Sequence, residues 1–93
     1  MHKSIIVNLN IKACYLCGTI GPVEAHHCIH GTANRRLADK DGLIVNLCPE
    51  CHRELHDKGM SDDLLKRIAQ EQWQRYNLAT KNEFIARYGR SYT

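Results

Sequence analysis

The sequence predicts a single α+β domain, residues 1–93, in which a small metal-stabilised core is followed by C-terminal helices. Three observations support this prediction: the short length of 93 residues, two CxxC pairs, and apolar runs that are strand-like first and helix-like later. A chain this short buries too little apolar surface to be stable without an added cross-link. We expect the core at about residues 14–59 and a helical extension at about residues 61–93.

The core is expected to contain short strands, a knuckle and one helix. Apolar runs bounded by turn residues predict three strands, at residues 4–9, 23–29 and 43–47. Residues 14–21 predict a metal-binding knuckle that turns at Gly18. A helix should begin at Pro49, because proline fits the first helical turn, and should end at Gly59.

The remaining segments are predicted to be a loop and two helices. Residues 31–42 have few apolar side chains, so we expect a surface loop, the usual place for substrate contacts. Ser61 is a candidate N-cap for the first helix. The apolar stripe expected to pack this helix into the core is Leu64, Leu65, Ile68, Trp73 and Tyr76. Thr80 and Glu83 fit a capping box for a last helix that ends at Gly89.

Four of the five cysteines have the spacing of a zinc site: Cys14, Cys17, Cys48 and Cys51. A knuckle and the first turn of a helix can close on one ion with such pairs, so we expect a structural Zn²⁺. A disulfide framework is the alternative, but the cysteine count is odd and we expect no secretory segment before the pairs. Cys28 is expected to be a small buried residue.

Histidines suggest a second metal site. His52 and His56 lie four residues apart on the predicted helix, so they should share one face and chelate one ion. One residue of the pair His26 and His27 would add a third imidazole ligand, and the other would remain uncoordinated. Three histidine ligands with an additional free imidazole are typical of a hydrolytic metal centre. A solvated polar helix face is the alternative for the helix histidines. The helix cysteines should point about 90° away from them, so one helix can serve two metals. The other histidines, His2 and His30, are expected to be surface residues.

The charge balance permits a nucleic-acid partner without requiring one. The formal net charge is +3, and four thiolates with two divalent cations leave it at +3. The apolar run within residues 1–12 is too short for a signal segment or a membrane span. We therefore expect a cytosolic protein that does not enter the membrane.

Two strings carry a family resemblance: EAHH at residues 24–27, and CPECHRELH at residues 48–56. Separated by a loop and a strand, they resemble the HNH nucleases, whose core is a ββα-metal fold of treble-clef type. The resemblance covers about half of the chain, roughly residues 14–59. It is closest to small phage-associated HNH-like proteins, which share the strings GTANR at residues 31–35 and FIARYGRSY at residues 84–92 in similar form.

The resemblance implies a metal-dependent DNA endonuclease that hydrolyses phosphodiester bonds. It makes His26 a ligand and His27 the general base, with His52 and His56 completing the site of a catalytic divalent metal: Mg²⁺, Mn²⁺, Ni²⁺ or Zn²⁺. It also implies DNA as partner, with phage recombination or packaging proteins as further candidates. The cellular setting would be the cytoplasm of a bacterium that carries the phage or prophage.

The sequence departs from the family at the middle asparagine. That position, nine residues before the helix histidine, is Leu43 here. Other residues that could orient the base or brace the loop are Asn34, Asp41 and Asn46, although Asn46 lies three residues too late for the family role. In addition, His26 and His27 can serve one phosphate only if the strand ends or bulges there, because neighbours on a strand point to opposite faces.

The predicted DNA contacts are Arg35 and Arg36, which lie just beyond the histidine pair. Solvated charge in a loop is the alternative for both. A non-catalytic zinc module that binds nucleic acid or protein is the competing function, and the lost asparagine favours it. The sequence indicates neither an oligomeric state nor a preferred DNA sequence.

Overall fold

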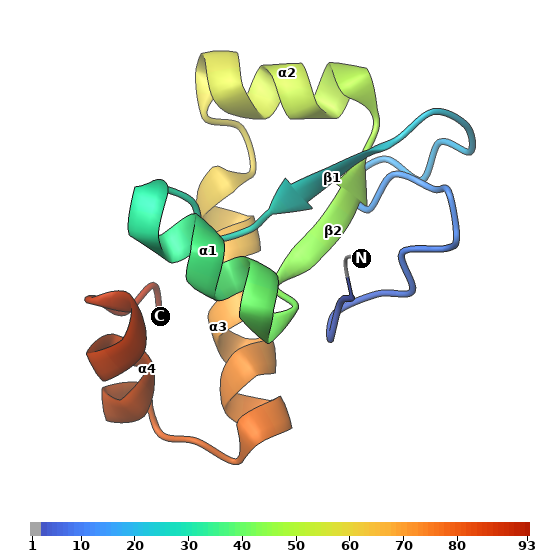
Figure 1. The fold of residues 1–93 in the computed structure, drawn as a ribbon. Coiled ribbons are helices and arrows are strands. Elements are labelled where there is room, and N and C mark those ends of the chain that lie inside the picture. The colour runs from blue at the N-terminus through green and yellow to red at the C-terminus, as the bar shows by residue number, and fades with distance from the viewer. Residues whose placement is uncertain (1–2) are drawn as a thin grey trace.

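The computed structural model describes residues 3–93 and confirms the α+β class, with two strands and four helices in that part of the chain (Figure 1). The expectation for His2 lies outside the described residues. The elements are β1 (Glu24–His27), α1 (Thr32–Asp41), β2 (Ile44–Leu47), α2 (Pro49–Lys58), α3 (Asp62–Asn77) and α4 (Lys81–Tyr88). No helix within residues 3–93 has the length and apolar character needed to cross a bilayer.

The two strands form an antiparallel sheet at the centre of the molecule, and α1 connects them. His26 pairs with Val45, and Glu24 pairs with Leu47. In the view of Figure 1, α2 lies above this sheet and the C-terminal helices lie below it. One cluster of buried side chains, running from Cys14 to Tyr88, joins the sheet to all of the helices. The predicted core and the helical extension therefore share their apolar interior.

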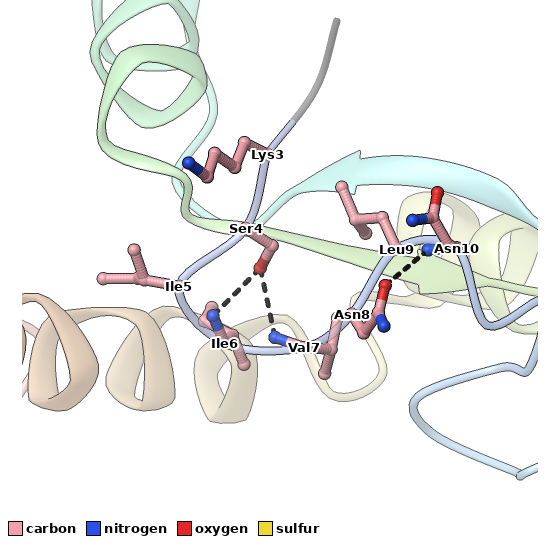
Figure 2. A pocket seen from close by; sticks show the side chains of 8 residues that line it. All are labelled: Lys3, Ser4, Ile5, Ile6, Val7, Asn8, Leu9 and Asn10. Carbon is pink, nitrogen blue, oxygen red and sulfur yellow. Dashed lines mark hydrogen bonds between the residues drawn. The ribbon is translucent and has the colours of Figure 1, made fainter.

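Residues 4–9, predicted to be a strand, form a bend instead. Figure 2 shows the Ser4 hydroxyl accepting hydrogen bonds from the backbone N–H groups of Ile6 (2.9 Å) and Val7 (3.2 Å). The same hydroxyl donates to the carbonyl of Ile44 at 2.6 Å. A serine hydroxyl that captures nearby N–H groups competes with a sheet ladder for them. The apolar run is therefore fixed against β2 by a side chain rather than by strand pairing.

Residues 31–42, predicted to be a surface loop, contain helix α1. Its inward face consists of residues spaced three or four apart, and each of them is buried or half-buried: Asn34, Leu37, Ala38 and Asp41. Gly42 ends the helix in the left-handed conformation, at φ 75°. A Cβ atom at this position would lie 2.8 Å from the carbonyl oxygen of Lys3, so the close approach also requires glycine.

Helix α1 is fastened to α4 by hydrogen bonds at both of its ends. Asp41 accepts two from Arg87 (Nε 2.6 Å, Nη2 2.8 Å) and one from the Tyr88 hydroxyl (2.6 Å). Near the other end, Asn34 Nδ2 donates to the carbonyl of Tyr88 at 3.3 Å. Asn34 and Asp41 thus hydrogen bond to α4 and brace segment 31–42, which is the second of the two roles that the sequence suggested for them.

The buried face of α3 is only partly the predicted one. Leu65 and Trp73 are buried and Ile68 is half-buried, but Leu64 and Tyr76 are 40% and 69% exposed. Leu64 points about 100° away from its neighbour Leu65, and Tyr76 lies in the last helical turn. The interior positions that the sequence did not indicate are Ala69 and Gln70.

The two predicted N-caps have different outcomes. At α4, Thr80 and Glu83 form the capping box reciprocally, with Oγ1 of Thr80 3.1 Å from the Glu83 nitrogen and Oε1 of Glu83 2.9 Å from the Thr80 nitrogen. Ser61 precedes α3 as predicted, but its backbone is left-handed (φ 66°) and its side chain does not cap the helix. A capping side chain requires an extended backbone, which Thr80 has and Ser61 lacks.

Candidate metal centres

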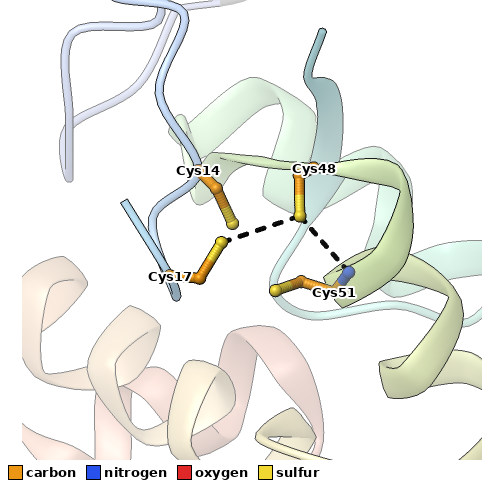
Figure 3. Close-up of side chains that lie close together, drawn as sticks. All are labelled: Cys14, Cys17, Cys48 and Cys51. Atoms are coloured by element: carbon orange, nitrogen blue, oxygen red, sulfur yellow. Dashed lines mark hydrogen bonds between the residues drawn. The ribbon is translucent and has the colours of Figure 1, made fainter. Parts of the chain in front are cut away.

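The thiols of the two CxxC pairs converge between the knuckle and the start of α2, as Figure 3 shows for Cys14, Cys17, Cys48 and Cys51. All four sulfur atoms lie within 4.8 Å of one another. The sulfurs of Cys17 and Cys48 are 3.7 Å apart. A tetrahedral zinc site with Zn–S bonds of about 2.3 Å has sulfur–sulfur edges of about 3.8 Å. The cluster predicted from the sequence is present, and its size suits a zinc ion.

Each CxxC pair is shaped by local hydrogen bonds. In the knuckle, the Gly18 nitrogen donates to the Cys14 carbonyl (2.9 Å), and the Cys14 nitrogen donates to the Thr19 carbonyl (3.0 Å). At α2, Cys48 occupies the N-cap position, where its sulfur accepts from the Cys51 nitrogen at 3.4 Å. Cys48 therefore caps the helix and faces the other thiols at the same time.

The thiols have divergent acidities when no cation is present. Burial acts to raise the pKa of Cys14, but backbone hydrogen bonds from Cys48, Cys17 and Leu16 outweigh it and lower the pKa to about 6. The pKa of Cys51 is raised by burial and by its thiol neighbours. Hydrogen bonds with Thr19 lower the pKa of Cys17 as well. Negative charge is thus favoured on the two knuckle sulfurs and disfavoured on Cys51. A divalent cation would remove this conflict and allow all four thiolates to form.

The histidine cluster combines His26 from the end of β1 with His52 and His56 from α2, and their ring nitrogens lie within 4.8 Å of one another. Nε2 of His52 and Nε2 of His56 are 3.0 Å apart, against an edge of about 3.3 Å for tetrahedral zinc with Zn–N bonds near 2.05 Å. Nε2 of His26 is buried and has no hydrogen-bond partner among the described residues. An unsatisfied buried nitrogen is costly, and a metal ion at this point would satisfy it.

The protonation and orientation of these imidazoles also suit a metal. Burial, followed by the nearby charges of His52, His30 and His56, lowers the pKa of His26 to about 4, so its nitrogen lone pair is available at neutral pH. Nδ1 of His52 is 2.6 Å from Oε1 of Glu24. A carboxylate on the far nitrogen is the usual support of a metal-binding histidine. Glu24 belongs to the EAHH string at residues 24–27, but its spacing in the sequence indicated no role for it.

His26 and His27 share one cavity of about 220 Å³, although they are neighbours on a strand. Neighbours on a strand can serve one site only where the strand ends or bulges, and β1 ends at His27. His27 is buried and lies outside the three-histidine cluster. Its Nε2 atom donates a hydrogen bond to Oδ1 of Asp39 at 3.0 Å. The sequence did not single out Asp39, because a segment expected to be a loop has no helical face that would show which of its polar side chains points toward the histidines.

His30 also lines this cavity, so the expectation of a plain surface residue was incomplete. It is exposed as expected, but its Nε2 atom is 2.9 Å from Oδ1 of Asp62. Asp62 in turn is 2.9 Å from Nζ of Lys66 on the same helix. His30 therefore links the wall of the cavity to the start of α3.

The other predicted site residues lie at different distances from this cavity. Arg35 and Arg36 are exposed on α1, and Arg35 lines the histidine cavity. Both arginines also line an adjoining hollow that includes His27 and Asp39. Asn46, a proposed orienting residue, instead donates to the carbonyls of residues 9 and 11 and so holds the N-terminal segment.

Leu43, at the position where the HNH resemblance predicts an asparagine, is fully buried in the apolar cluster. Its backbone carbonyl accepts from the Cys28 nitrogen at 2.9 Å. Cys28 is itself fully buried, as predicted, and burial raises the pKa of its thiol to about 12. Apolar side chains thus pack the end of the sheet where the HNH resemblance predicts an amide.

No family model matches the sequence, and no significant match occurs among curated proteins or solved structures. The class of protein that the fold and the two clusters define is a small α+β protein with a four-cysteine group and a three-histidine group, each able to hold a metal ion.

Proposed function

We propose that the protein is a metal-dependent DNA endonuclease of HNH type with a separate structural zinc ion. The observation that supports this most directly is the buried, unpartnered Nε2 of His26, which belongs to one cluster with the ring nitrogens of His52 and His56. Three imidazoles beside a cavity leave room for a substrate oxygen, as catalytic sites require and closed structural sites do not.

In this proposal His26, His52 and His56 hold the divalent ion, and His27 acts as the general base. When bound, the ion would supply charge stabilisation to the phosphate and to the leaving oxygen. His27 would take a proton from the attacking water, a task for which a neutral imidazole is suited near pH 7. Cys14, Cys17, Cys48 and Cys51 would bind Zn²⁺ and keep α2 in place.

DNA is the proposed partner because basic side chains border the cavity. Arg35 lines it, and Arg36 lines the adjoining hollow along α1. Both would contact phosphates flanking the scissile bond, which positions the backbone without reading base sequence. A phage-borne role in recombination or packaging, in the bacterial cytoplasm, is part of the proposal and depends on the sequence resemblance.

The decisive experiment is a nicking assay on supercoiled plasmid with Mg²⁺, Mn²⁺, Ni²⁺ and Zn²⁺ in turn. We expect nicked and linear products with at least one of these ions. The matched control is His56→Ala, which should abolish cleavage without unfolding the protein. An inactive wild type with every ion, or equal activity in His56→Ala, would contradict the proposal.

A non-catalytic zinc module that binds nucleic acid or protein is the second candidate. The observation that favours it is Leu43, which is fully buried and offers no polar group at the asparagine position. Metal analysis discriminates between the two. The binding module should contain one tightly bound zinc ion, whereas the nuclease should bind a second, weaker ion at the histidines.

A further inference from the structure

We propose that Asp39 is the positioning residue for His27. It would orient the base in place of the asparagine that the HNH resemblance predicts at position 43, where this chain has Leu43. The inference rests on the proposed function of His27 as base. Its starting point is the hydrogen bond from Nε2 of His27 to Oδ1 of Asp39, at 3.0 Å. The two residues come from different elements, the end of β1 and the third turn of α1.

The contact determines which ring nitrogen can act as the base. A neutral imidazole has one N–H donor and one lone pair. A carboxylate that accepts from Nε2 keeps the proton there, so Nδ1 is the nitrogen that can accept a proton from water. His27 is only 8% exposed, which restricts its ring further. Asp39 thus selects both the tautomer and the direction of the base.

Asp39 can do this because α1 is held firmly. The hydrogen bonds of Asp41 to Arg87 and to the Tyr88 hydroxyl fix the C-terminal end of the helix, two residues beyond Asp39. Arg35 lies one helical turn before Asp39, on the same face. One clamped helix therefore presents the carboxylate that orients the base and a guanidinium that lines the same cavity.

The side chain of Asp39 is 50% exposed, so its replacement should not disturb the core. This makes Asp39→Ala and Asp39→Asn suitable test variants. Asparagine keeps an oxygen that can accept from Nε2 of His27, whereas alanine does not. The exposed Asp63 on α3 supplies the matched control, Asp63→Ala.

The first measurement is independent of cleavage: long-range ¹H–¹⁵N NMR of the zinc-loaded full chain, which reports the tautomer of each histidine. We expect the His27 proton on Nε2 in wild type, Asp39→Asn and Asp63→Ala, and a tautomer mixture in Asp39→Ala. A His27 proton on Nδ1 in wild type, or a wild-type spectrum from Asp39→Ala, would overturn the inference.

The second measurement is plasmid nicking. Asp39→Ala should lower kcat roughly 10- to 100-fold, the usual cost of losing an orienting partner, with KM and metal affinity unchanged. Asp39→Asn should recover most of that rate. Loss of the metal in Asp39→Ala would also overturn the inference, because Asp39 would then support the ion rather than the base. If wild type cuts nothing but Asp39→Ala still shifts the tautomer, the nuclease proposal fails and the positioning role stands.

Discussion

The cysteine cluster and the histidine cluster share helix α2 but differ in how completely they enclose an ion. The cysteines supply four donors from two segments, and their spacing matches a closed tetrahedron. The histidines supply three donors beside a cavity that also contains His27 and Arg35. Both clusters use the same helix. A structural metal site therefore differs from a catalytic one in the number of donors and in the open space beside them.

The division of α2 between the sites follows from helical geometry. Cys48 and Cys51 lie at its first turn, and the next residue along the helix, His52, points about 100° away from Cys51. Glu24 on β1 then holds His52 by its far nitrogen. Residues 48–56 therefore supply two donors to each cluster without mixing thiol and imidazole ligands.

The largest effect is expected at the cysteine cluster, which we expect to be required for folding. Cys51→Ser should unfold or aggregate the domain, because it removes one of four zinc ligands from a small core. A strong chelator should have the same effect. Cys28→Ala, which changes a buried cysteine outside the cluster, should keep its zinc and its cooperative melting. A soluble, cooperatively melting Cys51→Ser protein without zinc would contradict the structural assignment.

The second test separates ligand from base within the histidine cavity. His27→Ala should slow cleavage by roughly 10² to 10⁴ and retain metal affinity, since removal of a general base has an effect of that size. His26→Ala should lose both. Nicking rates and metal titrations of the two variants show which histidine binds the ion and which acts as the base. The opposite pattern, with metal lost in His27→Ala and kept in His26→Ala, would reverse the two roles.

The third test concerns the independence of the two clusters. His56→Ala should keep the fold and the tightly bound zinc while the second ion binds at least tenfold more weakly, as expected when one of three ligands is lost. His30→Ala is the matched control, because His30 lines the same cavity but lies outside the cluster. Calorimetry with Zn²⁺ or Mn²⁺ measures both variants. Equal affinity in wild type and His56→Ala would remove the basis for a second metal.

The smallest effect is expected at the DNA surface. Changing Arg35 and Arg36 together to Ala should weaken DNA binding and reduce the slope of log K against log salt by up to about two, because two phosphate contacts are lost. Binding measured at several salt concentrations tests this. Arg67→Ala with Arg75→Ala on α3 gives a matched pair. If only the α3 pair changes the slope, the DNA surface lies there instead.

Most of the side chains in the two candidate metal clusters could be predicted from the sequence, because the spacing within each pair is local. CxxC pairs and histidines four residues apart bring their side chains together through one turn or one helical face. Their partners could not be predicted in this way. Glu24 and Asp39 act on histidines from other elements, and Asp39 lies in a segment whose helical period was carried by only a few apolar residues. Position in the fold, rather than spacing in the chain, creates these contacts.

The errors in the fold have a similar origin. Residues 4–9 have the composition of a strand, but the hydroxyl of Ser4 binds two of their N–H groups and bends them. Asn34 and Asp41 are the polar residues that a site would use, yet their hydrogen bonds brace α1 against α4. A polar side chain in a small domain can be required for packing as readily as for chemistry.

The peptide bond between Cys51 and His52 has a consequence for how the protein takes up ions. These adjacent residues belong to different clusters, so an ion bound at either one restrains the same turn of α2. Thermodynamic linkage requires such help to be reciprocal: whatever factor the zinc adds to the affinity of the histidines, an ion at the histidines adds to that of the cysteines. If both clusters bind ions, the coupling between them is therefore the same in both directions, and titrating either cluster with its neighbour filled or empty measures it.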